Sequence, residues 1–299
     1  MRKRRSKLNR NNAFDYINIT FMILLMLIMI FPFWTVVVTS FITAGEFYAN
    51  PIILWPRHAT TTAYEFIFAN DRLLRSFSVS IFVTVVGTIF YLIVTSALAY
   101  GMSKPTLPGR KFFIIILTIT MFFSGGLVPY YLLIRSLGLM NTIWCLILPG
   151  GVVIWDFIVM KSFFNQLPAE LEESAKIDGA GGILIFFRIV IPLSMPLIAT
   201  FSLFSAVRLW NSWFDAMIFI RDRDLQPLQL VLRQMIVGAG MPPEIMNMIA
   251  ARASVPSEVV FEEGLKMAIV TVAIIPILLI YPWLQKYFEK GVMIGSIKG

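Results

Sequence analysis

The chain has 299 residues, of which 58% are hydrophobic and 14% are charged, and its formal net charge is +8. Because roughly half apolar residues is already usual for soluble domains, this composition and a mean hydropathy of +0.79 indicate a membrane protein with several spans. The lone Cys145 supplies neither a disulfide framework nor a metal cluster, so we interpret it as a core residue and the single His58 as a loop residue. The basic residues lie beside apolar segments, which suits an anionic membrane surface and argues against a nucleic-acid partner.

Six stretches are apolar enough over about 20 residues to cross a bilayer as helices. They fall at about 17–41, 77–100, 112–134, 142–164, 189–214 and 265–287. The first is too long for a cleaved signal peptide and lacks a small-residue cleavage site. Where a span contains proline or glycine, we expect a kink rather than a break, because neighbouring helices can satisfy the freed backbone groups. These residues are Pro32, Gly125, Gly126, Pro149, Gly150, Gly151, Pro192, Pro196, Pro276 and Pro282.

The basic residues predict the orientation, because loops on the cytoplasmic side are enriched in lysine and arginine. They concentrate before the first span, between the second and third, around the segment between the fourth and fifth, and after the last. With six spans these segments share one side, so we expect both termini to be cytoplasmic. The longer loops at 42–76 and 216–264 then face outward, the second with a short helix between Pro243 and Ala253. The expected organisation is a basic N-terminus at 1–16, a six-helix, all-α membrane domain at 17–289 and a tail at 290–299.

The sequence "ELEESAKIDGAGGILIFFRIVIPLSMP" places acidic, glycine-interrupted residues between two apolar stretches. Pro168 suits the first turn of a helix, and the glutamates that follow suit the positive end of its dipole. Gly179 is a stop signal, and we expect Asp178 to cap a second short helix that leads into the fifth span. The sequence therefore predicts a short cytoplasmic helix lying across the membrane surface.

One face of this short helix is narrow enough for another protein to approach closely. Helical spacing places Leu171, Ser174, Ala175 and Asp178 on that face. A connector that rests on lipid headgroups is the alternative, but the segment is acidic and lacks a basic face, so anionic lipid would repel it. We therefore favour a helix that docks on a partner.

The segment resembles the EAA motif in the membrane subunits of ABC importers, where Glu-Ala-Ala is followed after three residues by Gly and after nine more by Ile-x-Leu-Pro. Ser174 replaces the middle alanine and Ile191 replaces the leucine, with every spacing kept. In that family the motif forms a coupling helix that sits in a cleft of the ATP-hydrolysing subunit. The resemblance implies this coupling role for Glu173, Ser174, Ala175, Asp178, Gly179, Ile189 and Pro192.

The resemblance extends over nearly the whole chain. "FFSGGLVPYYLLIRSLGLMNTIWCLILPG" and "LWNSWFDAMIFIRDRDLQPLQLVL" look like the maltose-type permeases, and within that group the chain is most similar to the LplC/YtcP-like permeases of polysaccharide-fragment importers. The ending "GVMIGSIKG" resembles the tail of the second permease subunit, which implies that Gly295, Lys298 and Gly299 reach the ATPase interface. The implied architecture is the type I ABC importer permease fold, with the coupling helix at about 168–188 between the fourth and fifth spans.

The sequence carries no nucleotide-hydrolysing site of its own. It has no G-x-x-x-x-G-K-[ST] phosphate loop, and its "GAGG" segment lacks the lysine. Metal-ligand spacing, a nucleophile elbow and H-E-x-x-H are also absent, so we expect a transport subunit without enzymatic activity or cofactor. The resemblance implies a homologous second permease, an ABC ATPase dimer that uses Mg-ATP, an extracytoplasmic solute-binding protein near 238–243, and a bacterial cytoplasmic membrane.

Charged residues at membrane depth are costly, and their first interpretation is functional. Arg208 and Asp215 share a face if the fifth span is one helix, and tryptophan faces and polar groups between them suit sugars. The alternative is that Arg208 pairs with Asp156 or Asp215 to hold helices together while the tryptophans anchor at the interface. A cation in the path favours an acidic sugar. The candidate pathway residues are Asp156, Arg208, Trp210, Asn211, Trp213 and Asp215.

A second candidate set lies in the third span, although helix packing through small residues is the favoured interpretation there. Its members are Phe122, Phe123, Gly125, Gly126 and Tyr130. The expected function is the permease subunit of an ATP-driven oligosaccharide importer that works by alternating access. An ABC permease for a peptide or another non-sugar solute is the first alternative. A secondary transporter needs its own ion site and typically an internal repeat, and a membrane enzyme needs converging catalytic groups; the sequence shows neither.

Overall fold

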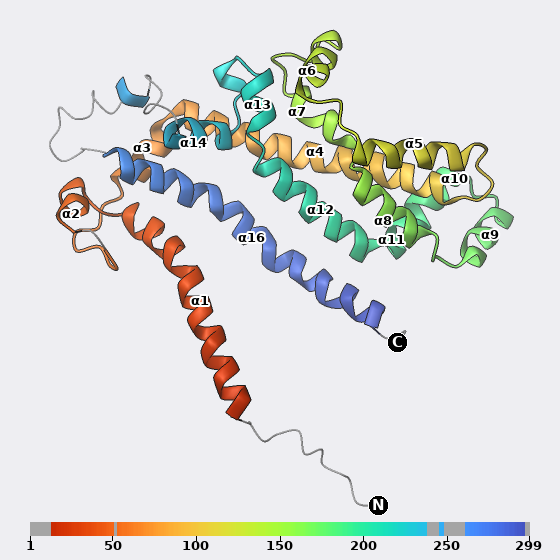
Figure 1. Ribbon diagram of the computed structural model, residues 1–299, viewed down its shortest axis with the longest axis horizontal. Coiled ribbons are helices and arrows are strands. Elements are labelled where there is room, and N and C mark those ends of the chain that lie inside the picture. The colour runs from red at the N-terminus through yellow and green to blue at the C-terminus, as the bar shows by residue number, and fades with distance from the viewer. Residues whose placement is uncertain (1–12, 51–52, 238–244, 248–260, 297–299) are drawn as a thin grey trace, which may run out of the picture. The chain divides into compact units, whose positions relative to one another are not determined.

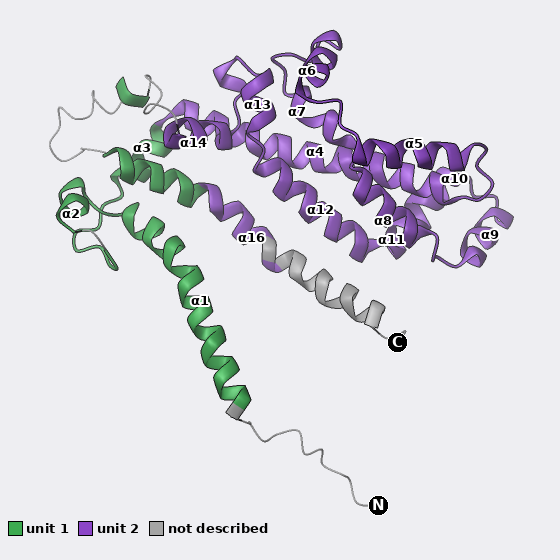
Figure 2. Ribbon diagram, in the orientation of Figure 1, with its two compact units in different colours: residues 1–69, 241–272 green, residues 70–240, 273–299 purple. Residues whose placement is uncertain are grey.

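The computed structural model describes residues 13–50, 53–237, 245–247 and 261–296 (Figure 1). Every labelled element in these ranges is helical, and no strand occurs among them. The chain falls into two compact units, one formed by 1–69 and 241–272 and the other by 70–240 and 273–299 (Figure 2). The prediction of an all-α fold is confirmed.

The first unit contains the helices at the start of the chain. They are α1 (Ala13–Thr39), α2 (Ala44–Ala49), α3 (Thr62–Ala69) and the beginning of α16 (Glu262–Ser296). α1 is apolar on all sides, and most of its side chains from Phe14 to Phe33 are exposed. A helix of this length and composition suits a lipid environment. Inside the unit, the indole nitrogen of Trp34 donates to the carbonyl of Leu54 at 2.8 Å, which ties α1 to the loop after α2.

The second unit is built around α4 (Asp71–Ser103), against which α8 (Ile154–Phe164) and α12 (Met195–Trp210) pack most extensively. The buried positions of α4 are mostly small: Ser76, Ser80, Thr84, Gly87, Thr88, Thr95, Ser96 and Ala99. Small residues let helix backbones approach closely in a membrane. At Gly87 an added Cβ would lie 2.7 Å from a methyl carbon of Leu209, so the Leu209 side chain of α12 would have to shift.

Shorter elements complete the second unit. Between α4 and α8 they are α5 (Arg110–Phe122), α6 (Leu127–Ser136), α7 (Trp144–Ile147) and η1 (Pro149–Gly151). The coupling segment holds α9 (Ala169–Ile177), α10 (Gly182–Ile185), the π-helical turn η2 (Phe186–Val190) and α11 (Ile191–Leu193). After α12 come α13 (Phe214–Phe219), η3 (Arg223–Leu225) and α14 (Leu228–Val237).

Length and composition identify three described helices that could cross a membrane, and up to five if each of two bent pairs is one span. The expected third span, 112–134, is divided instead into α5 and α6 by the non-helical residues 123–126. Gly126 has a φ of 83°, a conformation that glycine adopts without steric cost. Its N–H donates to the hydroxyl of Ser124 at 3.2 Å rather than to a helix carbonyl, which explains the break.

The expectation was that proline and glycine would not break the spans. The helices do continue through Pro32 in α1 and through the two internal prolines of α16. At two other places the expectation is wrong. Residues 144–151 and α8 are bent by 44°, and residues 182–193 and α12 are bent by 85°. Pro192 and Pro196 stand on either side of the sharper bend, where each removes a backbone donor from the helix.

Some predictions fall on residues outside the described ranges. The short helix expected between Pro243 and Ala253 lies mostly there. So do most of the basic N-terminus and the last residues, Lys298 and Gly299. These predictions stay untested.

Candidate functional site

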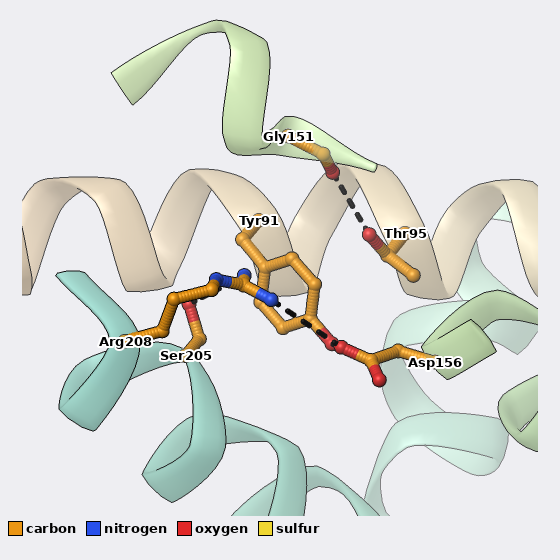
Figure 3. A network of polar contacts seen from close by, with 6 residues as sticks. All are labelled: Tyr91, Thr95, Gly151, Asp156, Ser205 and Arg208. Atoms are coloured by element: carbon orange, nitrogen blue, oxygen red, sulfur yellow. Dashed lines mark hydrogen bonds and ion pairs between the residues drawn. The ribbon is translucent and has the colours of Figure 1, made fainter. Parts of the chain in front are cut away.

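Three helices of the second unit meet at the buried carboxylate of Asp156 (Figure 3). Asp156 is on α8 and is 7% exposed. The hydroxyl of Tyr91 on α4 donates to its Oδ2 at 2.5 Å, and the same oxygen lies 3.7 Å from Nη1 of Arg208 on α12. The alternative in which Arg208 and Asp156 pair across helices therefore matches the geometry, and a tyrosine joins them.

Within the described ranges, the guanidinium of Arg208 is held only by long contacts. Besides the 3.7 Å contact with Asp156, its Nη2 lies 3.5 Å from the hydroxyl of Ser205, and its central carbon lies 5.0 Å from the centre of the Tyr91 ring. The Arg208 side chain is 40% exposed, whereas that of Asp156 is 10% exposed. A guanidinium carries five N–H donors. Because these contacts are long and the side chain is partly exposed, most of the donor capacity of Arg208 is available to a ligand.

The bend between η1 and α8 is stabilised by a side chain of α4. The hydroxyl of Thr95, which is fully buried, donates to the carbonyl of Gly151 at 2.8 Å (Figure 3). In a membrane, a carbonyl that a helix break leaves without its usual partner needs another donor. Thr95 supplies that donor, which explains how the chain can turn into α8 and place Asp156 opposite Tyr91.

Arg208 opens into a hollow that contains four of the six predicted pathway residues. The hollow is lined by Leu146, Pro149, Gly150, Arg208, Leu209, Asn211, Ser212, Trp213, Phe214 and Asp215. The amide nitrogen of Asn211 donates to the carbonyl of Val207 at 2.8 Å. The centre of the Trp213 ring lies 3.9 Å from the guanidinium carbon of Arg233. The hollow thus joins an accessible cation, aromatic side chains, neutral polar groups and the carboxyl group of Asp215.

The structure differs from the predicted pathway geometry in two details. Trp210 does not line this hollow: its side chain is buried, its indole nitrogen donates to the carbonyl of Ala273 at 3.0 Å, and its ring packs on Phe77. Asp215 does not continue the helix of Arg208, because α12 ends at Trp210 and Asp215 belongs to α13. The turn between these helices, rather than a shared helix face, brings Asp215 to the hollow.

The second candidate set, in the expected third span, contributes little to this site. Phe122 and Phe123 are 73% and 75% exposed at the end of α5. Tyr130 packs edge-on against Phe219 at 5.3 Å between ring centres. This geometry fits the packing interpretation for Tyr130, and the two glycines mark the break between α5 and α6.

The predicted surface helix is present as α9, and Gly179 ends it. Gly179 has a φ of 82°, and its N–H donates to the carbonyl of Lys176 at 3.0 Å. The N–H of Ala180 donates to the carbonyl of Ala175 at 2.9 Å. These two bonds form a Schellman motif, which satisfies the last carbonyls of the helix. Asp178 is the C-terminal cap of α9, so the prediction that it begins the second helix is wrong; Gly181 precedes α10.

The residues of the EAA-like motif divide into an exposed part and a packed part. Glu173 and Ser174 are exposed on α9, and two apolar neighbours are also exposed, Ile177 at 86% and Ile183 at 78%. Ala175 and Ile189 pack against the hydrophobic cluster around Phe164 and Phe186, and Pro192 lies just before the 85° bend. The motif therefore has an exposed part on α9, at Glu173 and Ser174, and a part that packs against the hydrophobic cluster, at Ala175 and Ile189.

Helices long and apolar enough to cross a membrane, with a polar network between helices of the second unit, indicate an integral membrane protein. Residues 77–294 match the family described as "Binding-protein-dependent transport system inner membrane component", and the chain belongs to this family. It is therefore a membrane permease, and the predicted resemblance to carbohydrate ABC importer permeases is confirmed.

The chain is similar over nearly its whole length to two proteins of Bacillus subtilis (strain 168). It is 42% identical to the polygalacturonan/rhamnogalacturonan transport system permease protein YtcP, over 97% of this chain and 100% of that protein. It is 44% identical to the protein LplC, over 96% and 95%. Among solved structures it matches a chain of a bacterial ABC transporter involved in the import of the acidic polysaccharide alginate, with a TM-score of 0.85, 29% identity, and coverage of 93% and 97%. The predicted permease fold is thereby confirmed.

Tyr91 and Ser205 belong to the polar network, but the sequence reasoning missed them. Both residues are neutral, whereas the prediction of pathway residues started from charged groups at membrane depth. Tyr91 stands among the serines and threonines of α4, and that polar stripe within an apolar span was the available signal. A buried carboxylate needs a donor, so an intramembrane Asp156 also called for a hydroxyl partner.

Proposed function

We propose that this chain is one of two homologous permease subunits in an ATP-driven importer of acidic oligosaccharides. In the proposal it spans a bacterial inner membrane several times, with both termini in the cytoplasm. A solute-binding protein delivers the sugar from outside, and an ABC ATPase dimer supplies Mg-ATP hydrolysis. The family membership and the printed cargo of YtcP and of the alginate transporter support this assignment.

The proposal of an acidic cargo rests on the accessible guanidinium of Arg208. Tyr91 donates to Asp156 at 2.5 Å, whereas the contacts of the arginine with described residues are long and its side chain lines the same hollow as Trp213. Guanidinium groups bind carboxylates through charge-assisted hydrogen bonds, and aromatic faces suit the C–H surfaces of sugars. A uronic-acid unit offers both features. The proposed contacts are Arg208, Asn211, Trp213 and Asp215, with Asp156 holding the arginine in place.

α9 is the proposed contact with the ATPase. Its exposed face includes Glu173 and Ser174, and the Gly179 turn and the cluster beneath Ile189 connect it to the helices of the second unit. An exposed helix with apolar neighbours on a rigid base suits docking into a partner cleft. The proposed coupling residues are Glu173, Ser174, Ala175, Asp178, Gly179, Ile189 and Pro192, and the tail residues Gly295, Lys298 and Gly299 are proposed to extend the same interface.

The proposal is tested by uptake into proteoliposomes that contain the chain with its permease, ATPase and binding-protein partners. We expect ATP-dependent uptake of galacturonate oligomers to exceed that of neutral galactose oligomers of equal length. Arg208→Gln should lower uptake of the acidic oligomers roughly tenfold, the order expected for one charge-assisted hydrogen bond, and leave any neutral uptake unchanged. Arg208→Lys keeps the charge but not the planar fork and should be intermediate.

Arg135→Gln is the matched control, because Arg135 is also an exposed arginine but lies at the end of α6, outside the hollow. Equal uptake by the Arg208→Gln and control complexes, with both assembled, would remove the acidic-sugar proposal. A complex that carries no ATPase, or that transports peptides in preference to sugars, would remove the wider assignment.

A further inference from the structure

The end of α4 and the start of α9 are joined by an ion pair. Lys104 is the C-terminal cap of α4, and its ammonium contacts a carboxylate oxygen of Glu172 in the first turn of α9. The two side chains are only 29% and 13% exposed. Such a pair is held more firmly than an exposed one, because water competes less for either charge.

Aromatic side chains support this ion pair. The Lys104 ammonium lies 4.2 Å from the centre of the Tyr100 ring, one turn earlier on α4. The same ring lies 5.4 Å from the ring of Phe186 and 6.3 Å from that of Phe164, measured between centres. Phe164 ends α8 and Phe186 begins η2, so the helices before and after α9 both hold the base of the ion pair. A displacement of α9 is therefore transmitted to α4 through these side-chain contacts and not only through the flanking loops.

α4 connects this ion pair rigidly to the polar network. It is continuous from Asp71 to Ser103 and contains no proline. Tyr91, which donates to Asp156, lies on the same helix, roughly 20 Å from Lys104 at a rise of 1.5 Å per residue. A continuous helix of this length can carry a displacement from one end to the other.

We propose that the Lys104–Glu172 ion pair is a positioning contact that transfers movement of α9 to α4, and through α4 to the Arg208 site. The inference rests on the proposed function, because it requires an ATPase that moves α9. Neither residue belongs to the set that the EAA resemblance implies. Without the pair, α9 still engages the ATPase but its movement reaches α4 less completely, so less sugar crosses the membrane for each ATP hydrolysed.

The test measures sugars transported per ATP in the reconstituted full complex. Lys104→Glu and Glu172→Lys should keep ATP hydrolysis that the binding protein stimulates, and should each lower the ratio about fivefold, the lower end of typical couplings between sites. The double variant exchanges the two charges and should restore more than half of the parental ratio. Lys111→Glu is the control, because Lys111 has the same charge as Lys104 but is exposed near the start of α5, outside α9; its ratio should stay parental.

An unchanged ratio in both single variants, or a double variant no better than the singles, would overturn the inference. If charge reversal prevents assembly, the neutral variants Lys104→Met and Glu172→Gln are measured in the same way, with the same expectation and the same overturning result. Failure of the proposed function looks different, because the parental complex would then lack an ATPase or take up no acidic sugar.

Discussion

Gly179 offers a direct test of how α9 is built. An alanine there would have to adopt the φ of 82° that ends the helix. For a residue with a Cβ, the left-handed conformation costs about 1–2 kcal/mol relative to its preferred regions. No heavy atom lies within 4 Å of the position that the Cβ would take, so the cost comes from the backbone alone.

The expected effect of Gly179→Ala is a loosened end of α9. A cost of about 1 kcal/mol increases the population of the opened end roughly fivefold, because the two Schellman hydrogen bonds then form less often. Gly181→Ala is the matched control, since Gly181 has a φ of −73° and also has open space around its Cβ position. Gly179→Asn should fall between the parent and the alanine variant, because asparagine tolerates the left-handed region.

Hydrogen exchange of the peptide that contains residues 179–180 measures this opening. The amides of Gly179 and Ala180 donate the two hydrogen bonds, so they should exchange about fivefold faster in Gly179→Ala and at the parental rate in Gly181→Ala. Transport should fall in the same order as protection falls. Equal exchange in the two alanine variants would refute the conclusion that the left-handed turn holds the end of α9.

Two further substitutions test the polar network and the packing of α4. Tyr91→Phe removes the donor to Asp156, which should cost ~1–3 kcal/mol of stability and lower the uptake of acidic sugar, because Arg208 is then drawn onto the buried carboxylate of Asp156; unchanged uptake would contradict the network. Gly87→Val should cost about 1–3 kcal/mol, because its Cβ would lie 2.7 Å from Leu209, and should lower the melting temperature in detergent. Gly101→Val on the same helix meets no heavy atom within 4 Å of its Cβ, and a similar loss there would show that glycine replacement in α4 is harmful for another reason.

The sequence predicted the coupling segment well because its signals are local. A helix start near Pro168, acidic residues in the first turn and a glycine stop each depend on neighbouring residues, and α9 runs between the expected limits. The error at Asp178 has the same local origin. The C-terminal end of one helix and the N-cap of the next were both possible at Asp178. The Schellman turn at Gly179 makes Asp178 the C-terminal cap of α9.

The breaks in the spans could not be predicted in the same way. Proline in a membrane helix produces a small kink or a sharp bend according to which distant donor is available. At Gly151 the donor is Thr95, which lies far away in the sequence on α4. One site prediction follows from these bends: Asp215 was expected on the same helix face as Arg208, whereas α12 ends at Trp210 and Asp215 reaches the hollow from α13.

Glu46 on α2 holds the loop that follows it through two backbone donors. The N–H of Arg57 donates to Oε1 at 2.8 Å, and the N–H of His58 donates to Oε2 at 3.2 Å. Both bonds favour the ionised carboxylate, and the bond from Arg57 is the largest cause that lowers the pKa of Glu46 below its ordinary value of 4.5. A lowered pKa means that the carboxylate stabilises the folded loop above pH 4.5, and that this contribution is lost as the pH falls through the folded-state pKa.

Glu46→Gln should therefore weaken the loop at neutral pH and change it little at strongly acidic pH. Glutamine keeps one acceptor oxygen but presents an amide group to the other backbone donor, so one of the two N–H groups loses its partner. Protection factors of the Arg57 and His58 amides, corrected for the pH dependence of intrinsic exchange, measure this directly. Glu65→Gln on α3 is the control, because the Glu65 carboxylate accepts from the side chain of Thr61 and bonds neither loop amide. If the protection of the parental chain stayed constant from neutral pH to well below 4.5 and matched the Glu46→Gln variant throughout, the two backbone hydrogen bonds to the carboxylate would not be what holds the loop.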